Sequence, residues 1–168
     1  MQIKTKRMVL TAILFSVAIV LSIIEAMLPT PLPIPGVKFG LSNIVVMYAL
    51  FFLRKQEAFF IAILKGLFVG LTRGIIASLL SISGGVSSII VMLFFMKLAK
   101  EKGSLFLYSM FGALAHNLGQ FAVISVIYTS ISIWYYLPIL VIAGMVAGVV
   151  TAILLSVIMP ALKKLELF

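Results

Sequence analysis

The chain contains no cysteine and no aspartate, and its only acidic residues are four glutamates in 168 residues. The absence of cysteine excludes disulfides, thiolate catalysis and cysteine-based metal sites. Because one histidine and four scattered glutamates are poor material for a metal site, we expect no metal, no cofactor and no catalytic residue. Charged residues make up only 10% of the chain, against about 25% in soluble domains. With 64% hydrophobic residues, the composition indicates an integral membrane protein.

The basic residues are gathered rather than spread. Ten of the 13 fall in four clusters, which are Lys4/Lys6/Arg7, Arg54/Lys55, Lys97/Lys100/Lys102 and Lys163/Lys164. Apolar stretches long enough to cross a bilayer singly or in pairs separate these clusters, and basic loops stay on the cytoplasmic side. The pattern predicts three outward and return passages, with both termini on the cytoplasmic side of the cell membrane. The clusters also explain the net charge of +9 as contact with the lipid bilayer, so nucleic-acid binding is not expected.

We therefore predict an all-α fold, a single transmembrane domain over residues 1–168. Its six spans are expected at about 8–28, 39–53, 58–80, 86–96, 104–128 and 137–162. Four prolines between Leu28 and Gly36 exclude helix there and predict a stiff outer loop. The adjacent glycines Gly84 and Gly85 suggest a second outer loop at residues 81–85.

Two basic residues, Lys65 and Arg73, fall inside the predicted third span, where an ionisable side chain is costly and therefore a candidate for function. Their spacing places them near one face of the helix. Gly66, Gly70 and Gly74 repeat every four residues beside them, as in a strip that lets another helix approach closely. We predict that both basic residues bind a ligand. The alternative for Lys65 is that its amino group reaches back to the cytoplasmic border.

The predicted fifth span carries three polar residues, His116, Asn117 and Gln120. His116 and Gln120 share a helix face, whereas Asn117 is turned about 100° away. At membrane depth each must hydrogen-bond to something. We predict a ligand-binding face, and the alternative is a polar clamp between helices.

A further polar cluster is expected at the outer side, where Glu25, Lys38, Ser42 and Asn43 lie close in the sequence. Glu25 is expected to pair with Lys38 or Arg73, since an ion pair would neutralise a charge that lipid does not tolerate. Ligand binding and a purely structural ion pair both remain open for this cluster. Because the cavity so formed would be basic and polar, its guest is expected to be anionic or neutral and polar.

Three blocks of sequence carry a resemblance to a known family. They are Glu25…Leu28-Pro…Pro35-Gly-Val-Lys-Phe-Gly-Leu-Ser-Asn-Ile44, then Ser83-Gly-Gly85, then Gly112-Ala…His116-Asn…Gln120. The chain resembles the Gx transporter family, whose members are also labelled heptaprenyl diphosphate synthase component I. That family is similar to the substrate-binding S components of energy-coupling factor (ECF) transporters.

The resemblance implies an S-component-like bundle of six helices whose outward pocket takes up a vitamin-like, anionic, isoprenoid or quinone-related precursor. It also implies a partner, an energising module made of a membrane scaffold and an ATPase pair. The small residues Ala12 and Ser16 of the first span could correspond to the docking stripe, with packing inside the bundle as the alternative. The other label implies a non-catalytic membrane partner of a soluble synthase, because such synthases use aspartate-rich motifs that this chain lacks.

Overall fold

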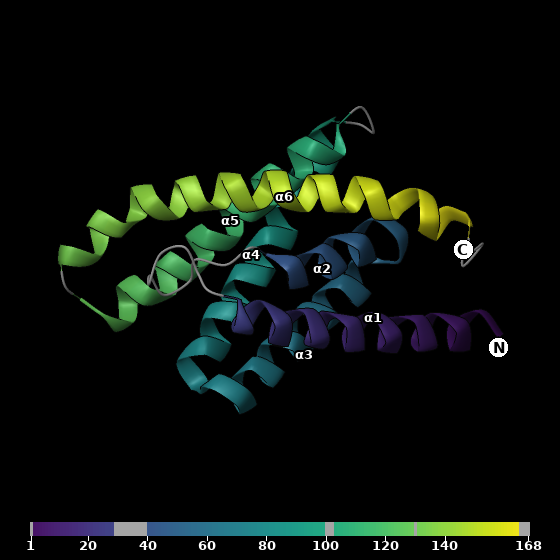
Figure 1. Ribbon diagram of the computed structural model, residues 1–168, viewed down its shortest axis with the longest axis horizontal. Helices are drawn as coiled ribbons and strands as arrows, with labels where there is room; N and C mark the ends of the chain where they lie inside the picture. Colours follow the sequence, from purple (N-terminus) through teal and green to yellow (C-terminus); the bar gives the residue numbers. More distant parts are fainter. Residues whose placement is uncertain (1, 29–39, 100–102, 130, 165–168) are drawn as a thin grey trace.

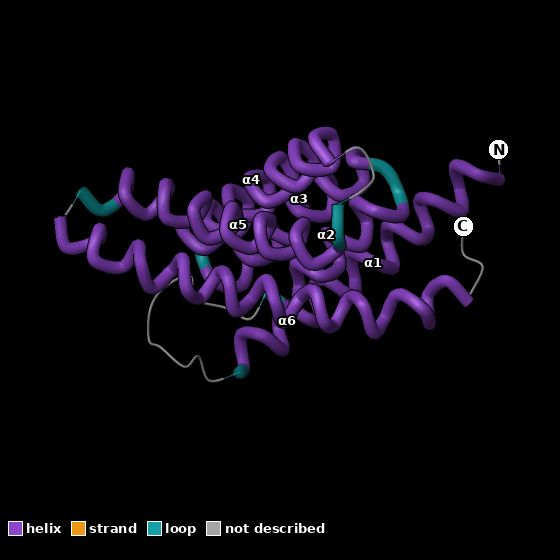
Figure 2. The backbone as a smooth tube through the Cα atoms, turned by 90° about the horizontal axis from the view of Figure 1, so that it is seen from above, coloured by secondary structure: helices purple, strands orange, loops and turns teal. Residues whose placement is uncertain are grey.

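The computed structural model describes residues 2–28, 40–99, 103–129 and 131–164. Throughout this part of the chain all regular structure is helical (Figure 2). The elements are α1 (Gln2–Met27), α2 (Leu41–Phe52), α3 (Lys55–Arg73), α4 (Ile75–Ala99), α5 (Leu105–Ile127), the short 3-10 helix η1 (Ile131–Tyr136) and α6 (Leu137–Lys164). The all-α class predicted from composition and charge pattern is confirmed.

The helices form one elongated bundle. Figure 1 shows α6 running along most of the molecule and α1 running in the opposite direction. The beginning of α1 and the end of α6 lie at the same end of the bundle in both views (Figures 1 and 2). α4 contacts both α3 and α5, α5 contacts α6, and α1 contacts α2 and α3. The main core cluster takes side chains from all six α-helices.

Four of the described helical segments are long and apolar enough to cross a membrane, namely Thr5–Met27, Ile75–Ala99, Leu105–Ile127 and Trp134–Ile158. Their outward faces carry large apolar side chains, such as Met8, Ile90 and Val126, that are largely exposed. Such a surface is unfavourable in water and suited to lipid. The chain is a membrane protein, while its orientation across the membrane stays a prediction.

The remaining two α-helices differ from these four. α2 has only 12 residues, and every residue from Ile44 to Leu50 is buried. α3 carries Lys65 and Arg73 on a helix that is otherwise rich in apolar and small residues. A helix enclosed by its neighbours does not itself have to match the thickness of the bilayer. The short length of α2 therefore follows from its central position.

The predicted boundary between the third and fourth spans is wrong. α3 ends at Arg73, α4 begins at Ile75, and Gly74 alone makes the turn between them. Gly74 has φ of 90°, which only glycine adopts readily. Residues 81–85, expected to be an outer loop, lie inside α4. The predicted fourth span begins too late, because two adjacent glycines in a sequence fit a turn as well as a helix contact.

The two glycines of α4 serve helix packing. A Cβ atom on Gly84 would lie 2.7 Å from Cε1 of His116 on α5, and one on Gly85 would lie 3.2 Å from Cβ of Ala62 on α3. Any larger residue would push α4 away from its neighbours. The predicted glycine strip on α3 is used in the same way, since a Cβ on Gly66 would overlap Ile82 of α4. In α4, glycine therefore marks close contact rather than a chain reversal.

The other predicted bounds differ from α1, α2, α5 and α6 by a few residues, mostly at the start of α1. The proline loop and Lys38 fall within residues 29–39, which lie outside the described residues.

Candidate ligand-binding site

A cavity of about 270 Å³ lies inside the bundle and is lined from all six α-helices. Seven of the eight predicted ligand-binding residues line it, and they are Glu25, Asn43, Lys65, Arg73, His116, Asn117 and Gln120. The eighth, Lys38, is outside the described residues. The structure thus brings together residues from four different helices, although their role in binding stays a prediction.

One side of the cavity is built around Glu25 of α1, which is 5% exposed. Its Oε1 accepts hydrogen bonds from the backbone N–H groups of Gly40 and, at 3.2 Å, Leu41. These are the amides of the N-cap and of the first residue of α2, and the N-cap Gly40 has φ of 76° and no side chain of its own. A helix start buried in a bundle must have its free N–H groups satisfied, and a carboxylate also suits the positive end of the helix dipole. Glu25 therefore caps α2 from a neighbouring helix.

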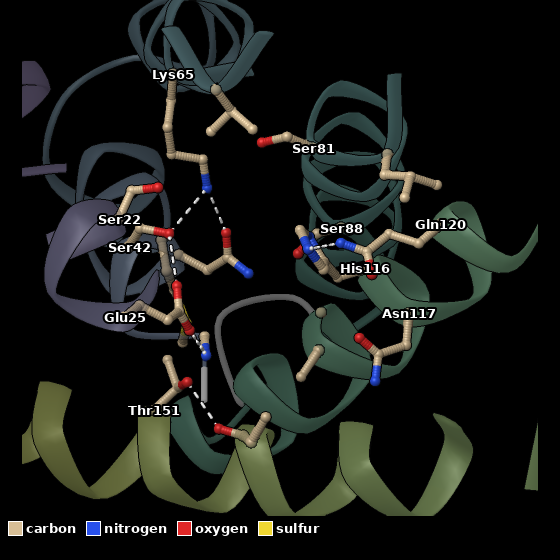
Figure 3. Close-up of a pocket in the computed structure, with 18 of the residues that line it drawn as sticks. Ser22, Glu25, Ser42, Lys65, Ser81, Ser88, His116, Asn117, Gln120 and Thr151 are labelled. Atoms are coloured by element: carbon tan, nitrogen blue, oxygen red, sulfur yellow. Dashed lines mark hydrogen bonds between the residues drawn. The ribbon is translucent and has the colours of Figure 1, made fainter. Parts of the chain in front are cut away.

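The same carboxylate is linked to Lys65 through a serine. Ser42 donates from Oγ to Glu25 Oε2 at 3.3 Å and accepts from Lys65 Nζ at 3.3 Å. Lys65 Nζ also donates to Asn43 Oδ1 at 2.7 Å. We call Glu25, Ser42, Asn43 and Lys65 the carboxylate wall. Figure 3 shows Glu25, Ser42 and Lys65 on one side of the cavity. Lys65 is only 3% exposed, so its ammonium faces inward and does not reach back to the membrane border.

Arg73 lies at the end of α3, where a cation favours the negative end of the helix dipole. Its Nη2 donates to the backbone carbonyl oxygen of Ser22 on α1 at 2.6 Å. Of the two predicted partners of Glu25, Arg73 forms no ion pair with it in the described part of the chain, where Glu25 instead holds the start of α2, and Lys38 lies outside the described residues. A guanidinium has five donors, and one is used by Ser22, so Arg73 keeps capacity for a guest.

The opposite side of the cavity is formed by α5, and we call His116, Asn117 and Gln120 the histidine wall (Figure 3). All three are less than 10% exposed. Nε2 atoms of Gln120 and His116 lie 2.9 Å apart, which confirms that these two residues share a helix face. Asn117 instead donates from Nδ2 to the carbonyl oxygen of Leu140 on α6 at 2.8 Å. Asn117 is thus the clamp between helices that the sequence left open.

Gln120 retains hydrogen-bonding capacity toward the cavity. Its Oε1 is buried and has no hydrogen-bond partner among the described residues. Rotating the amide would exchange oxygen and nitrogen, but one polar group of Gln120 would still be left for a guest. Since buried polar groups in native proteins are nearly always paired, this atom points to a ligand or ordered water.

Apart from Ser42, the hydroxyl groups of the site are not predicted from the sequence. Ser22, Ser81, Ser88, Ser109 and Thr151 also line the cavity and are all buried. Ser81 is not predicted as a cavity residue, because the glycines beside it predict a loop at residues 81–85. The signal was present in α4 as small polar residues at Ser78, Ser81 and Ser88 in an apolar helix, which at helical spacing mark an inward face.

The ionisable groups of the cavity are unbalanced. Lys65 and Arg73 supply two cations, and Glu25 supplies one carboxylate. An acidic or carbonyl group on a guest would relieve this excess of positive charge in a site of low polarity. Among the described residues, no three potential metal ligands from His, Cys, Asp and Glu lie close together.

The predicted docking residues lie on the outside of the bundle. Ala12 and Ser16 are both exposed on α1, and Ser16 Oγ donates to the carbonyl oxygen of Ala12 at 3.0 Å. Packing inside the bundle, the alternative for this pair, is therefore wrong.

Comparison with known families gives one match. The family model for heptaprenyl diphosphate synthase component I covers residues 14–158. The chain belongs to this family, which agrees with the resemblance seen in its sequence. No curated protein and no solved structure matches the chain.

Proposed function

We propose that this member of the component I family is a substrate-binding membrane subunit, equivalent to the S component of an ECF-type transporter. It captures a small molecule in the central cavity, and a partner complex supplies the energy. The observation that carries this proposal is a buried polar cavity, lined from all six α-helices and with an excess of positive charge. A purely structural membrane subunit has no need to place two cations and an unsatisfied amide around an internal space.

The two walls suggest the chemistry of the ligand. Arg73, with Lys65 nearby in the cavity, favours an anionic or carbonyl group. Gln120 Oε1 favours a group that donates a hydrogen bond, such as a hydroxyl or an amide N–H. The ligand is therefore a compact molecule with an acceptor at one end and a donor at the other.

The volume of the cavity limits the class of ligand further. A cavity of about 270 Å³ lies just below the range of about 300–1,000 Å³ seen for drug-sized ligands. A chain of seven isoprene units is larger than this space. An isoprenoid guest would have to be a short precursor or insert only its head group, so vitamin-like acids and quinone precursors remain in the class.

Partner docking is assigned to the outward face of α1. Ala12 and Ser16 are exposed and small, so a helix of a membrane scaffold could approach the α1 backbone closely there. The chain has no P-loop motif for nucleotide, so an ATPase pair would have to accompany that scaffold.

A second function is favoured by the family description itself, which names a component of heptaprenyl diphosphate synthase. In that case the chain is a non-catalytic membrane partner of a soluble synthase, because it has no aspartate for a magnesium–diphosphate site. The central cavity would then hold no stoichiometric transport substrate.

Native mass spectrometry of the protein, gently extracted from its own membrane, separates the two. A stoichiometric small ligand together with a scaffold and an ATPase pair supports the transport function. A soluble aspartate-rich synthase attached to a chain with an empty cavity would replace it with the accessory-subunit function. An isolated chain with neither would leave a structural assembly role and contradict both.

A further inference from the structure

The carboxylate of Glu25 already occupies a place in the central cavity that suits an anionic group of a guest. The start of α2 lines the cavity through Gly40, Ser42 and Asn43. Free N–H groups at the start of a helix are a common binding site for phosphate. Here the amides of Gly40 and Leu41 both donate to Glu25 Oε1. A guest phosphate could reach these two amides only by displacing the carboxylate.

The carboxylate wall also uses most of the donors of Lys65. Its Nζ donates to Ser42 Oγ at 3.3 Å and to Asn43 Oδ1 at 2.7 Å. Since an ammonium group has three N–H donors, at least two of them are used within the wall. Arg73 is different, because its one hydrogen bond to the carbonyl oxygen of Ser22 leaves other donors of the guanidinium group unused. Arg73 is therefore the cation that remains for a guest.

The charges of the described lining residues match a guest with a single negative charge. Lys65 and Arg73 contribute two positive charges and Glu25 contributes one negative charge, which leaves one positive charge when His116 is neutral. A guest with one ionised group neutralises this excess. A phosphate ester carries a charge of about −1.5 to −2, and a diphosphate carries more. Either of them would leave surplus negative charge beside Glu25 in a site of low polarity, which is unfavourable.

We infer that Glu25 determines the specificity of the cavity, which accepts a small acid with a single carboxylate and rejects phosphates and diphosphates. This inference rests on the proposed capture of a small molecule in the cavity. The guest carboxylate binds Arg73, because a planar carboxylate can accept two parallel hydrogen bonds from a guanidinium group. Gln120 Oε1 is left for a donor elsewhere on the acid. Although the family description names a diphosphate synthase, a prenyl diphosphate is then not the guest.

The test identifies what the full chain retains from the small-molecule extract of the cells that naturally produce it. Purified protein is incubated with the extract and washed, and the bound molecules are released for mass spectrometry. Methyl esterification counts their carboxyl groups, and fragmentation reveals any phosphate. We expect one carboxyl group and no phosphate. A guest with a phosphate, a second acidic group or no acidic group overturns this inference but leaves the capture function standing. Retention of no molecule at all contradicts the capture function itself.

A gain of binding provides the second measurement. Glu25→Gln removes the negative charge, while its amide oxygen can still accept from Gly40. In the same extract it should raise the ratio of retained phosphate esters to retained carboxylic acids at least about tenfold, because the repulsion by a like charge is lost. Glu57→Gln is the matched control, since Glu57 does not line the central cavity, and it should leave the ratio unchanged.

The ratio is measured within one sample, so a smaller folded fraction of a variant does not imitate the change. An unchanged ratio in Glu25→Gln, or an equal rise in both variants, overturns the inference. If Glu25→Gln does not fold, the chemical class of the guest of the unmodified chain still decides the question.

Discussion

The two walls of the central cavity use their polar groups differently. In the carboxylate wall, Glu25, Ser42 and Lys65 form a continuous chain of hydrogen bonds, and Glu25 also caps α2. In the histidine wall, His116 and Gln120 contact each other, but Gln120 Oε1 has no partner among the residues that the structure describes. A buried charge must be paired for the protein to fold. An unpaired neutral group costs less free energy, so the folded protein can keep it unpaired until a ligand binds. We therefore expect the first wall mainly to maintain the fold and the second mainly to select the guest.

The largest effect is expected at Arg73, which lines the cavity but belongs to neither wall. Its substitution tests whether the cavity binds the ligand at all. Arg73→Glu should abolish ligand binding, by more than about 100-fold, because it replaces a donor to the guest with a like charge. The measurement is the amount of small molecule that co-purifies with the chain. Arg73→Lys keeps the charge and should retain part of the binding. Unchanged binding in the Glu variant would exclude the cavity as the ligand site.

The next effect concerns stability. Glu25→Gln should lower the free energy of unfolding by about 3 kcal/mol, because the start of α2 and the Lys65 network lose their only carboxylate. Thermal unfolding in detergent measures this change. The matched control is Glu57→Gln at the start of α3, which should cost about 0.5 kcal/mol as the loss of a helix-dipole interaction. Equal losses in the two variants would mean that Glu25 has no special structural role.

A pair of substitutions on α5 divides the histidine wall itself. Gln120→Leu removes an acceptor that has no partner among the described residues and also the contact of Gln120 Nε2 with His116, so it should lower ligand occupancy about tenfold and cost about 1–2 kcal/mol of stability. Asn117→Leu removes the hydrogen bond that joins α5 to the carbonyl oxygen of Leu140 on α6, so it should cost about 1–2 kcal/mol of stability with a smaller effect on ligand occupancy than Gln120→Leu has. An equal loss of ligand occupancy in the two variants would mean that Gln120 has no special part in binding the guest.

The smallest effect is expected from a glycine behind the histidine wall. Gly84→Ala should displace the ring of His116 and lower ligand occupancy about fivefold, the cost of one weakened hydrogen bond. Gly85→Ala is the control, because its new methyl group meets Ala62 on α3 instead of the histidine. It should affect stability without affecting occupancy. The same loss of occupancy in both variants would point to a general separation of α4 from α5.

Much of the fold can be predicted from the sequence, because the bilayer limits which backbone conformations a chain can adopt. Only a helix satisfies its own backbone hydrogen bonds in lipid, so apolar runs between basic clusters predict helices. This reasoning placed α2, α5 and α6 within a few residues. It failed at Gly74 and at Gly84–Gly85, because a glycine that turns the chain and a glycine that packs against another helix have the same local sequence signal. The neighbouring helices decide between the two uses. Gly74 turns the chain with φ of 90°, whereas Gly84 lies against His116 of α5.

Composition and charge spacing by themselves determined an all-α membrane protein, and the cost of charge in lipid marked Lys65, Arg73 and the polar residues of α5 for attention. The tertiary structure alone decided how these residues are used. In the folded chain Glu25 accepts hydrogen bonds at the start of α2, while Arg73 donates to Ser22. Asn117 donates to α6, and buried serines line the cavity. The reason is physical, since a hydrogen bond depends on distances of about 3 Å between groups far apart in the chain, and no spacing along the sequence fixes such distances.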